Sequence, residues 1–160
     1  MKKRYAIAAL AASLLGCGLH FLYDFLPNPL VAAFAPVNES PWEHLKLVFW
    51  PTLLAAAVLA WKSRNREGTW STFFLAELVM PMALLAGFAA LVAMGADSVA
   101  ADILLYFLTM FGGFAMAYSL QNNQTVERYG GFLLMFVILY GSMLILLTYA
   151  APDAALFRSP

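Results

Sequence analysis

The sequence predicts an all-α polytopic membrane protein, a bundle of five transmembrane helices. Of the 160 residues, 63% are hydrophobic and 11% are charged, whereas a soluble domain is about 45–50% apolar and about 25% charged. The apolar residues form continuous runs of helical length rather than the alternating pattern of a membrane β-barrel. Because so few charges cannot cover a surface that faces water, we expect the helices to lie in a lipid bilayer.

The rest of the composition excludes several kinds of partner and site. The formal net charge is zero, and no basic patch extends beyond two short flanks, so we expect no nucleic-acid partner. Cys17 is the one cysteine, which excludes an internal disulfide and a cysteine-rich metal site. The lipid bilayer is the partner that this composition predicts.

The first predicted span covers about residues 5–26, after the basic flank Met1–Arg4. Leu14–Cys17 resembles a lipoprotein cleavage box, but the chain stays apolar through Phe25, far beyond an ordinary signal-peptide core. We therefore expect an uncleaved helix. One face of this helix carries small residues, which permit close helix contact, and then a polar pair one turn apart: Ala9, Ser13, Gly16, His20 and Asp24.

A loop with three prolines, residues 27–39, leads to the second span, and its apolar part predicts a short half-helix. Ser40–Glu43 (SPWE) has the pattern of a helix start, with serine as N-cap, proline at the first helical position and glutamate completing a capping box. The second span then covers about residues 44–61. Within it, Pro51 lacks an amide hydrogen and so frees the carbonyl of Leu47.

Three further spans complete a single integral membrane domain, residues 1–160, and they cover about residues 70–94, 99–119 and 130–150. A basic hairpin precedes the third span, and a polar loop, residues 120–129, precedes the fifth. Glu77 lies within the third span, and the sequence leaves its role open. In the fourth span, Asp102 and Tyr106 lie one helical turn apart.

The distribution of basic residues predicts the orientation, because cytoplasmic loops carry an excess of lysine and arginine. With the N-terminus in the cytoplasm, seven of the nine basic residues lie on that side: Lys2, Lys3, Arg4, Lys62, Arg64, Arg66 and Arg128. Lys46 and Arg158 lie on the other side. Five spans then place the C-terminus outside, together with the loop before the second span.

Polar chemistry is concentrated in residues 36–51, PVNESPWEHLKLVFWP. This segment resembles the signature of a family of small bacterial membrane proteins known as a domain of unknown function. The similarity covers nearly the whole chain, including His20–Asp24 ahead of the signature and Asp102–Leu104 at the start of the fourth span. The resemblance implies a multi-pass protein of the bacterial cytoplasmic membrane and brings no known activity.

An ionisable side chain near the bilayer centre costs at least about 2.5–3.5 kcal/mol on insertion scales, so each one needs a reason. Convergence of the first, second and fourth spans would surround one pocket in the outer leaflet with His20, Asp24, Asn38, Glu39, Glu43, His44, Lys46 and Asp102. Imidazoles and carboxylates are ligands of zinc and other divalent metals, and we expect His20, Asp24 and His44 to be the metal ligands. The pocket would take up a small ion or a polar solute.

Two other interpretations stay open. The same residues could serve an intramembrane metal-dependent hydrolase or lipid-modifying enzyme, with Lys46 stabilising an anion. No motif identifies a catalytic residue. Alternatively, the polar cluster could lock the bundle of a structural or accessory subunit, with Ser40 and Glu43 acting as a helix cap. Five short spans leave little room for an independent transporter, so a transport function would favour a homo-oligomer.

Overall fold

Five long helices make up most of the fold, and each is long and apolar enough to cross a membrane. They are α1 (Lys3–Phe25), α3 (Pro41–Trp61), α4 (Arg66–Ala93), α5 (Val99–Leu120) and α7 (Gly130–Tyr149). The computed structural model describes residues 3–96 and 98–158, and all regular structure within these ranges is helical. The predicted all-helical fold is confirmed for these residues. Lys2, part of the predicted basic flank, lies outside them.

Side chains that cap the first turns set where the helices begin. Asn65 Oδ1 accepts a hydrogen bond from the Gly68 amide at 3.0 Å, which starts α4 four residues before the predicted span boundary. Ser40 Oγ accepts from the Glu43 amide at 3.4 Å, as predicted. The reciprocal half of the predicted capping box is wrong, because the Ser40 amide donates to Asn38 Oδ1 at 2.9 Å instead of to the Glu43 carboxylate.

Three short helical segments lie between and after the long helices: α2 (Pro29–Ala32), α6 (Gln124–Arg128) and η1 (Ala155–Phe157). α2 corresponds to the predicted half-helix. The loop predicted for residues 120–129 is wrong in part, because the Asn123 side chain caps a helical turn there. η1 lies over the start of α3, where the Phe157 and Trp42 ring centroids are 5.1 Å apart.

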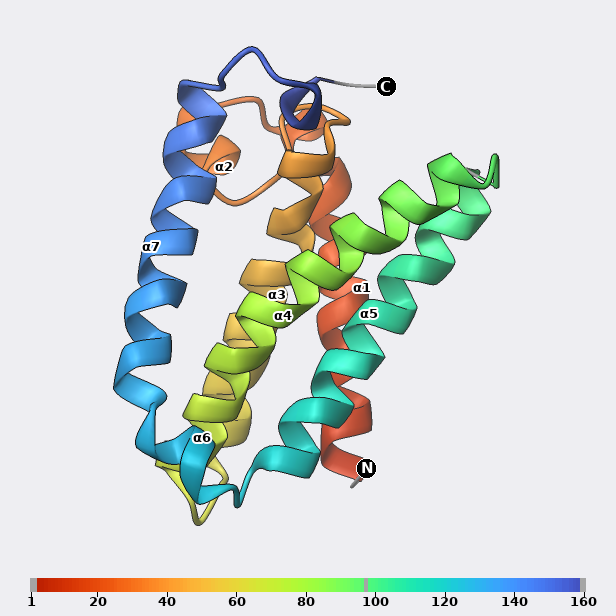
Figure 1. Cartoon of the computed structure of the whole chain (residues 1–160). Coiled ribbons are helices and arrows are strands. Elements are labelled where there is room, and N and C mark those ends of the chain that lie inside the picture. Colours follow the sequence, from red (N-terminus) through yellow and green to blue (C-terminus); the bar gives the residue numbers. More distant parts are fainter. Residues whose placement is uncertain (1–2, 97, 159–160) are drawn as a thin grey trace.

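The two central helices are α3 and α4. α3 contacts α1, α4 and α7, while α4 contacts α3, α5 and α7. Figure 1 shows that the tip of the α4–α5 hairpin leans away from the other helices. The predicted small-residue face of α1 does permit close packing: Ala9 and Ser13 are fully buried, and a Cβ on Gly16 would lie 2.6 Å from the Leu47 carbonyl oxygen of α3.

The described basic residues divide between the two ends of the bundle. One end, where α1 begins, carries Lys3, Arg4, Lys62, Arg64, Arg66 and Arg128, and we call it the basic end (Figure 1). α1 ends and α3 begins at the opposite end, which also holds α2 and η1 and which we call the loop end. Lys46 and Arg158 belong to the loop end. The division agrees with the asymmetry predicted from the sequence.

Candidate metal centre

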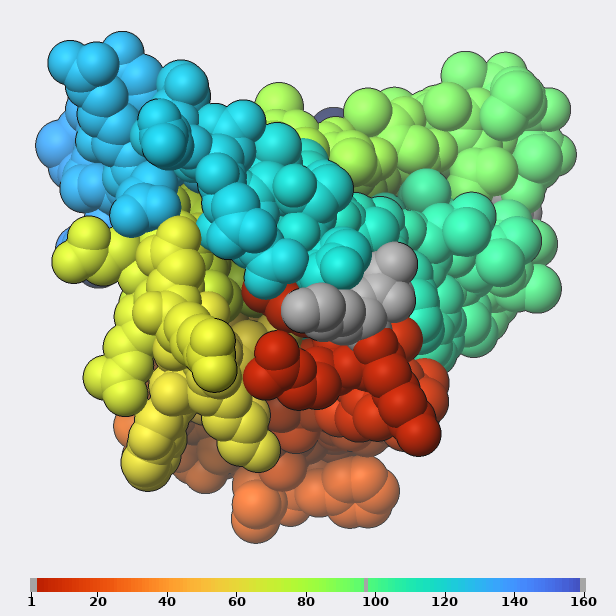
Figure 2. Space-filling view, turned by 90° about the horizontal axis from the view of Figure 1, so that it is seen from below, coloured from red at the N-terminus to blue at the C-terminus, as the bar shows by residue number. Residues whose placement is uncertain are grey.

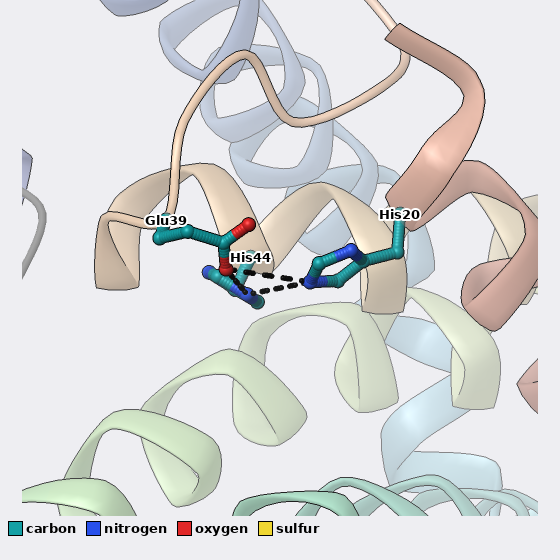
Figure 3. Close-up of side chains that lie close together, drawn as sticks. All are labelled: His20, Glu39 and His44. Carbon is teal, nitrogen blue, oxygen red and sulfur yellow. Dashed lines mark hydrogen bonds and ion pairs between the residues drawn. The ribbon is translucent and has the colours of Figure 1, made fainter. Parts of the chain in front are cut away.

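Three donor atoms meet at the loop end. His20 comes from the last turns of α1, Glu39 from the loop before α3 and His44 from the first turn of α3 (Figure 3). The Nε2 atoms of His20 and His44 lie 3.2 Å apart, and Glu39 Oε2 lies 3.5 Å from the first and 3.3 Å from the second. The prediction that the two histidines are neighbours is confirmed.

The three separations match those between ligands on a tetrahedral zinc ion. Zinc binds imidazole nitrogen and carboxylate oxygen at about 2.0–2.2 Å, which separates two tetrahedral ligands by about 3.3–3.6 Å. The triangle of 3.2, 3.3 and 3.5 Å follows this spacing closely. The side chains of His20 and His44 are 28% and 30% exposed, so a cation and a fourth ligand such as water have access.

The hydrogen bond of His44 to the backbone fixes its tautomer. Its Nδ1 lies 2.9 Å from the Ser40 carbonyl oxygen, which only accepts, so Nδ1 holds a proton and Nε2 presents a lone pair whenever the ring is neutral. Glu39 Oε2, also an acceptor, lies 3.3 Å from this lone pair. Two acceptors in contact repel each other unless a cation or a proton lies between them. Metal-binding histidines are commonly oriented by such a backbone carbonyl.

Asn38 shapes the backbone on both sides of Glu39. Its side-chain oxygen accepts a hydrogen bond from the Ser40 amide at 2.9 Å, which closes an Asx turn across residue 39. The same Ser40 then caps α3 and orients His44. Asn38, predicted as a pocket residue, therefore holds the backbone that carries Glu39 and is not itself part of the cluster.

Glu43 and Lys46 form a separate, buried ion pair. Lys46 Nζ donates to Glu43 Oε2 at 2.8 Å, to the Ala32 carbonyl at 2.7 Å and to the Ala35 carbonyl at 3.3 Å. The Lys46 side chain is 0% exposed and the Glu43 side chain is 3% exposed. All three N–H groups of the ammonium are used, so Lys46 is not available as the predicted stabiliser of an anion.

The same pair ties the loop to the last long helix. The Glu43 carboxylate also accepts from the Val37 amide at 3.0 Å and from the Thr148 hydroxyl at 3.0 Å. Thr148 was missed by the sequence reasoning, because a single hydroxyl near the end of an apolar run carries no signal. Through these bonds α2, α3 and α7 hold the loop that carries Glu39.

Asp24 lies outside the cluster, so the donor atoms that the structure brings together are those of His20, Glu39 and His44 and not the predicted set of His20, Asp24 and His44. α1 and α3 run antiparallel (Figure 1), so the turn after His20 lies level with the cap of α3 and not with His44. Asp24 is exposed there. The loop carboxylate of Glu39 takes the position that spacing along α1 suggested for Asp24.

Asp102 also lies outside the cluster. It lies one turn further toward the loop end than Tyr106, whose hydroxyl bonds to the Ser13 carbonyl of α1. Asp102 Oδ1 and His20 Nδ1 are both buried without a partner among the described residues.

Glu77 lies in the middle of α4 and is not a member of the cluster. Its side chain is fully buried, and neither carboxyl oxygen has a hydrogen-bond partner within residues 3–96 and 98–158. Burying a charged carboxylate without a partner costs free energy. The metal centre does not use this group.

Comparison with protein-family models matches residues 1–160 to a family of unknown function, DUF6512. The chain belongs to this family. Membership in DUF6512 confirms the resemblance to an uncharacterised domain family and extends it over the whole chain. No match was found among the curated proteins or the solved structures. Since DUF6512 brings no activity, the argument for function depends on the donor atoms of this chain.

Proposed function

We propose that this DUF6512 protein is a multi-pass membrane protein that binds a divalent metal ion, zinc by preference, through His20, Glu39 and His44. The site would face the outer leaflet of a bacterial cytoplasmic membrane, with the N-terminus in the cytoplasm. The five apolar helices and the concentration of cations at the basic end support this orientation. The triangle of donor atoms, with sides of 3.2, 3.3 and 3.5 Å, carries the proposal.

The types of donor favour zinc over other common divalent ions. Two imidazole nitrogens and one carboxylate oxygen suit zinc, whereas calcium takes six to eight oxygen ligands and magnesium keeps several waters. The backbone bond of His44 leaves its Nε2 lone pair facing Glu39 and His20. A bound cation would relieve the repulsion between this lone pair and the Glu39 carboxylate.

The test is zinc binding to the full-length protein in a neutral detergent. After removal of bound metal with a chelator, calorimetric titration with zinc should give one site per chain. His20→Ala and His44→Ala each remove a ligand, and we expect the affinity to fall by more than about tenfold, since even loss of an outer-shell partner costs 10–100-fold. Asp24→Ala, one turn from His20 on the same helix, is the matched control and should bind zinc as the native chain does.

Two outcomes would contradict the proposal. The first is zinc binding that survives both histidine substitutions. The second is an equal loss in Asp24→Ala, which would indicate diffuse attraction to acidic groups. If the histidine variants fail to fold even without metal, the cluster stabilises the helix bundle. That outcome would favour a structural or accessory subunit.

A metal-dependent hydrolase is the second candidate, and it is favoured because the cluster would supply three protein ligands and is partly exposed to solvent. Catalytic zinc sites combine three protein ligands with a water whose pKa the metal lowers. The buried pairing of Lys46 removes one expected stabiliser of the transition state. Zinc-dependent cleavage of an ester probe, absent in His44→Ala, would support hydrolysis. Zinc binding without any such cleavage would favour ion binding alone.

A further inference from the structure

A polar cavity lies at the basic end, at the opposite end of the bundle from the cluster of His20, Glu39 and His44. It has a volume of about 410 Å³ and is formed by the start of α1, the turn between α3 and α4, and the end of α5. Figure 2 views this end, where these segments are coloured red, yellow and cyan. The cations that line the cavity are Arg4, Lys62 and Arg64.

Hydrogen bonds between helices hold the walls of this cavity. Asn65 Nδ2 donates to the Gln121 carbonyl at 3.4 Å and to Glu127 Oε2 at 2.9 Å, which joins the α3–α4 turn to the end of α5 and to α6. The Tyr5 hydroxyl of α1 donates to Gln121 Oε1 at 3.3 Å. A Cβ on Gly68 would lie 2.6 Å from the Gln121 carbonyl oxygen, so only glycine permits this contact. The cavity is therefore shaped without any ligand.

The cationic groups of the cavity are free to bind an anion. Within the described ranges, none of Arg4, Lys62 and Arg64 takes part in an ion pair or a side-chain hydrogen bond. Among the residues that the structure describes, no acidic side chain lines the cavity, and the nearby Glu127 carboxylate accepts from Asn65. Three positive charges and the amide of Asn122 thus surround the cavity with unused donors.

Aromatic residues place the cavity at the level of lipid headgroups. Trp61, next to Lys62, is 79% exposed, and Tyr129 at the same end is 56% exposed. Tryptophan and tyrosine collect at the membrane–water interface, where their rings span the headgroup layer. Arginine recognises phosphate with two parallel hydrogen bonds, which suits Arg4 and Arg64.

We propose that this cavity binds a phosphate group, supplied by the headgroup of an anionic phospholipid in the leaflet that faces the basic end. A free phosphate ion offers the same chemistry and is the other source to be distinguished. The site is independent of the metal centre, because it shares no residue with it.

The test is native mass spectrometry of the full-length protein with phosphatidylglycerol and phosphatidylcholine present in equal amounts. The native chain should retain phosphatidylglycerol in preference. A triple variant, Arg4→Gln, Lys62→Gln and Arg64→Gln, should lose this preference by more than about tenfold, because each charge-assisted bond to phosphate is strong. The matched control removes three cations of the same end that do not line the cavity: Lys3→Gln, Arg66→Gln and Arg128→Gln.

The control separates a built site from general attraction to the membrane. It should leave the preference for phosphatidylglycerol largely unchanged, because these three side chains do not line the cavity. An equal loss in both triple variants, or no loss in the first, overturns the proposal. Added inorganic phosphate that displaces the lipid at millimolar concentration would assign the cavity to a free anion, and no displacement would assign it to the lipid. Unchanged thermal unfolding of the variants verifies that they are folded.

Discussion

The Tyr106 hydroxyl of α5 donates a hydrogen bond to the Leu47 carbonyl of α3 at 3.3 Å. Pro51, four residues after Leu47, has no amide hydrogen to offer this carbonyl, so the bond replaces the one that the helix lacks. The same hydroxyl lies 3.1 Å from the Ser13 carbonyl of α1. One side chain thereby joins three helices, two turns below the metal centre on α1.

Tyr106→Phe should destabilise the protein by about 1–3 kcal/mol, because it leaves the buried Leu47 carbonyl without a donor. Thermal unfolding in detergent measures the effect. Tyr129→Phe is the control, since the Tyr129 side chain is 56% exposed and its hydroxyl makes no hydrogen bond to the described residues. Equal unfolding temperatures of the two variants would show that the Tyr106 hydrogen bond does not stabilise the protein.

Gly16→Ala should destabilise the bundle by about 1–3 kcal/mol or more, as overpacking does in tight interfaces. The new Cβ would collide with the Tyr106 hydroxyl and lie 2.6 Å from the Leu47 carbonyl oxygen, so α1 would have to move away from α3. Gly18→Ala, two residues along the same helix, meets nothing within 4 Å. Because alanine favours a helix over glycine, Gly18→Ala should be as stable as the native chain or slightly more stable. The unfolding temperatures of the two variants provide the comparison.

Lys46→Met should cost about 3–5 kcal/mol, because it leaves the buried Glu43 carboxylate without a positive charge beside it. The double variant Lys46→Met with Glu43→Gln should recover part of this loss. Arg158→Met is the control, as it removes an ion pair with Asp153 that is exposed at the same end of the bundle. We expect no measurable change of the unfolding temperature for the control. A Lys46→Met protein as stable as the control would contradict the structural role of the pair.

Zinc occupancy should fall as the pH is lowered. Zinc binds neutral imidazole, so protons compete with the metal for the ring nitrogen. Protonation of His20 and His44 therefore weakens binding, and raising the pH restores it. Calorimetric titration at several pH values measures the slope, and release of protons on zinc binding is the accompanying signature. Affinity that does not depend on pH would exclude imidazole ligands.

The sequence predicted the helices well because a continuous apolar run of bilayer length can satisfy its backbone hydrogen bonds in few structures other than a helix. It also placed His20 and His44 together, since the small-residue face of α1 shows which side packs against the next helix. The freed carbonyl of Leu47 followed from Pro51 alone. These predictions depend on local periodicity and on the chemistry of single residues.

The details of the site depend on the path of the loop, which local periodicity does not describe. Spacing along α1 favoured Asp24 as the partner of His20, but the loop brings Glu39 there instead. A lysine at the start of a span usually extends to the headgroups. Lys46 instead bonds to the carbonyls of Ala32 and Ala35. Every residue has a backbone carbonyl, so the sequence does not indicate which of them the lysine contacts.

The bond between Thr148 and Glu43 links the first third of the chain to its end. A ribosome that has made only the first two long helices has already supplied His20, Glu39 and His44, yet the loop that holds Glu39 still lacks its anchor on α7. Tyr149 adds a second anchor by donating to the Pro29 carbonyl. The loop that carries Glu39 therefore gains both anchors only after the last helix has been synthesised and packed, and a prematurely shortened chain would lack them.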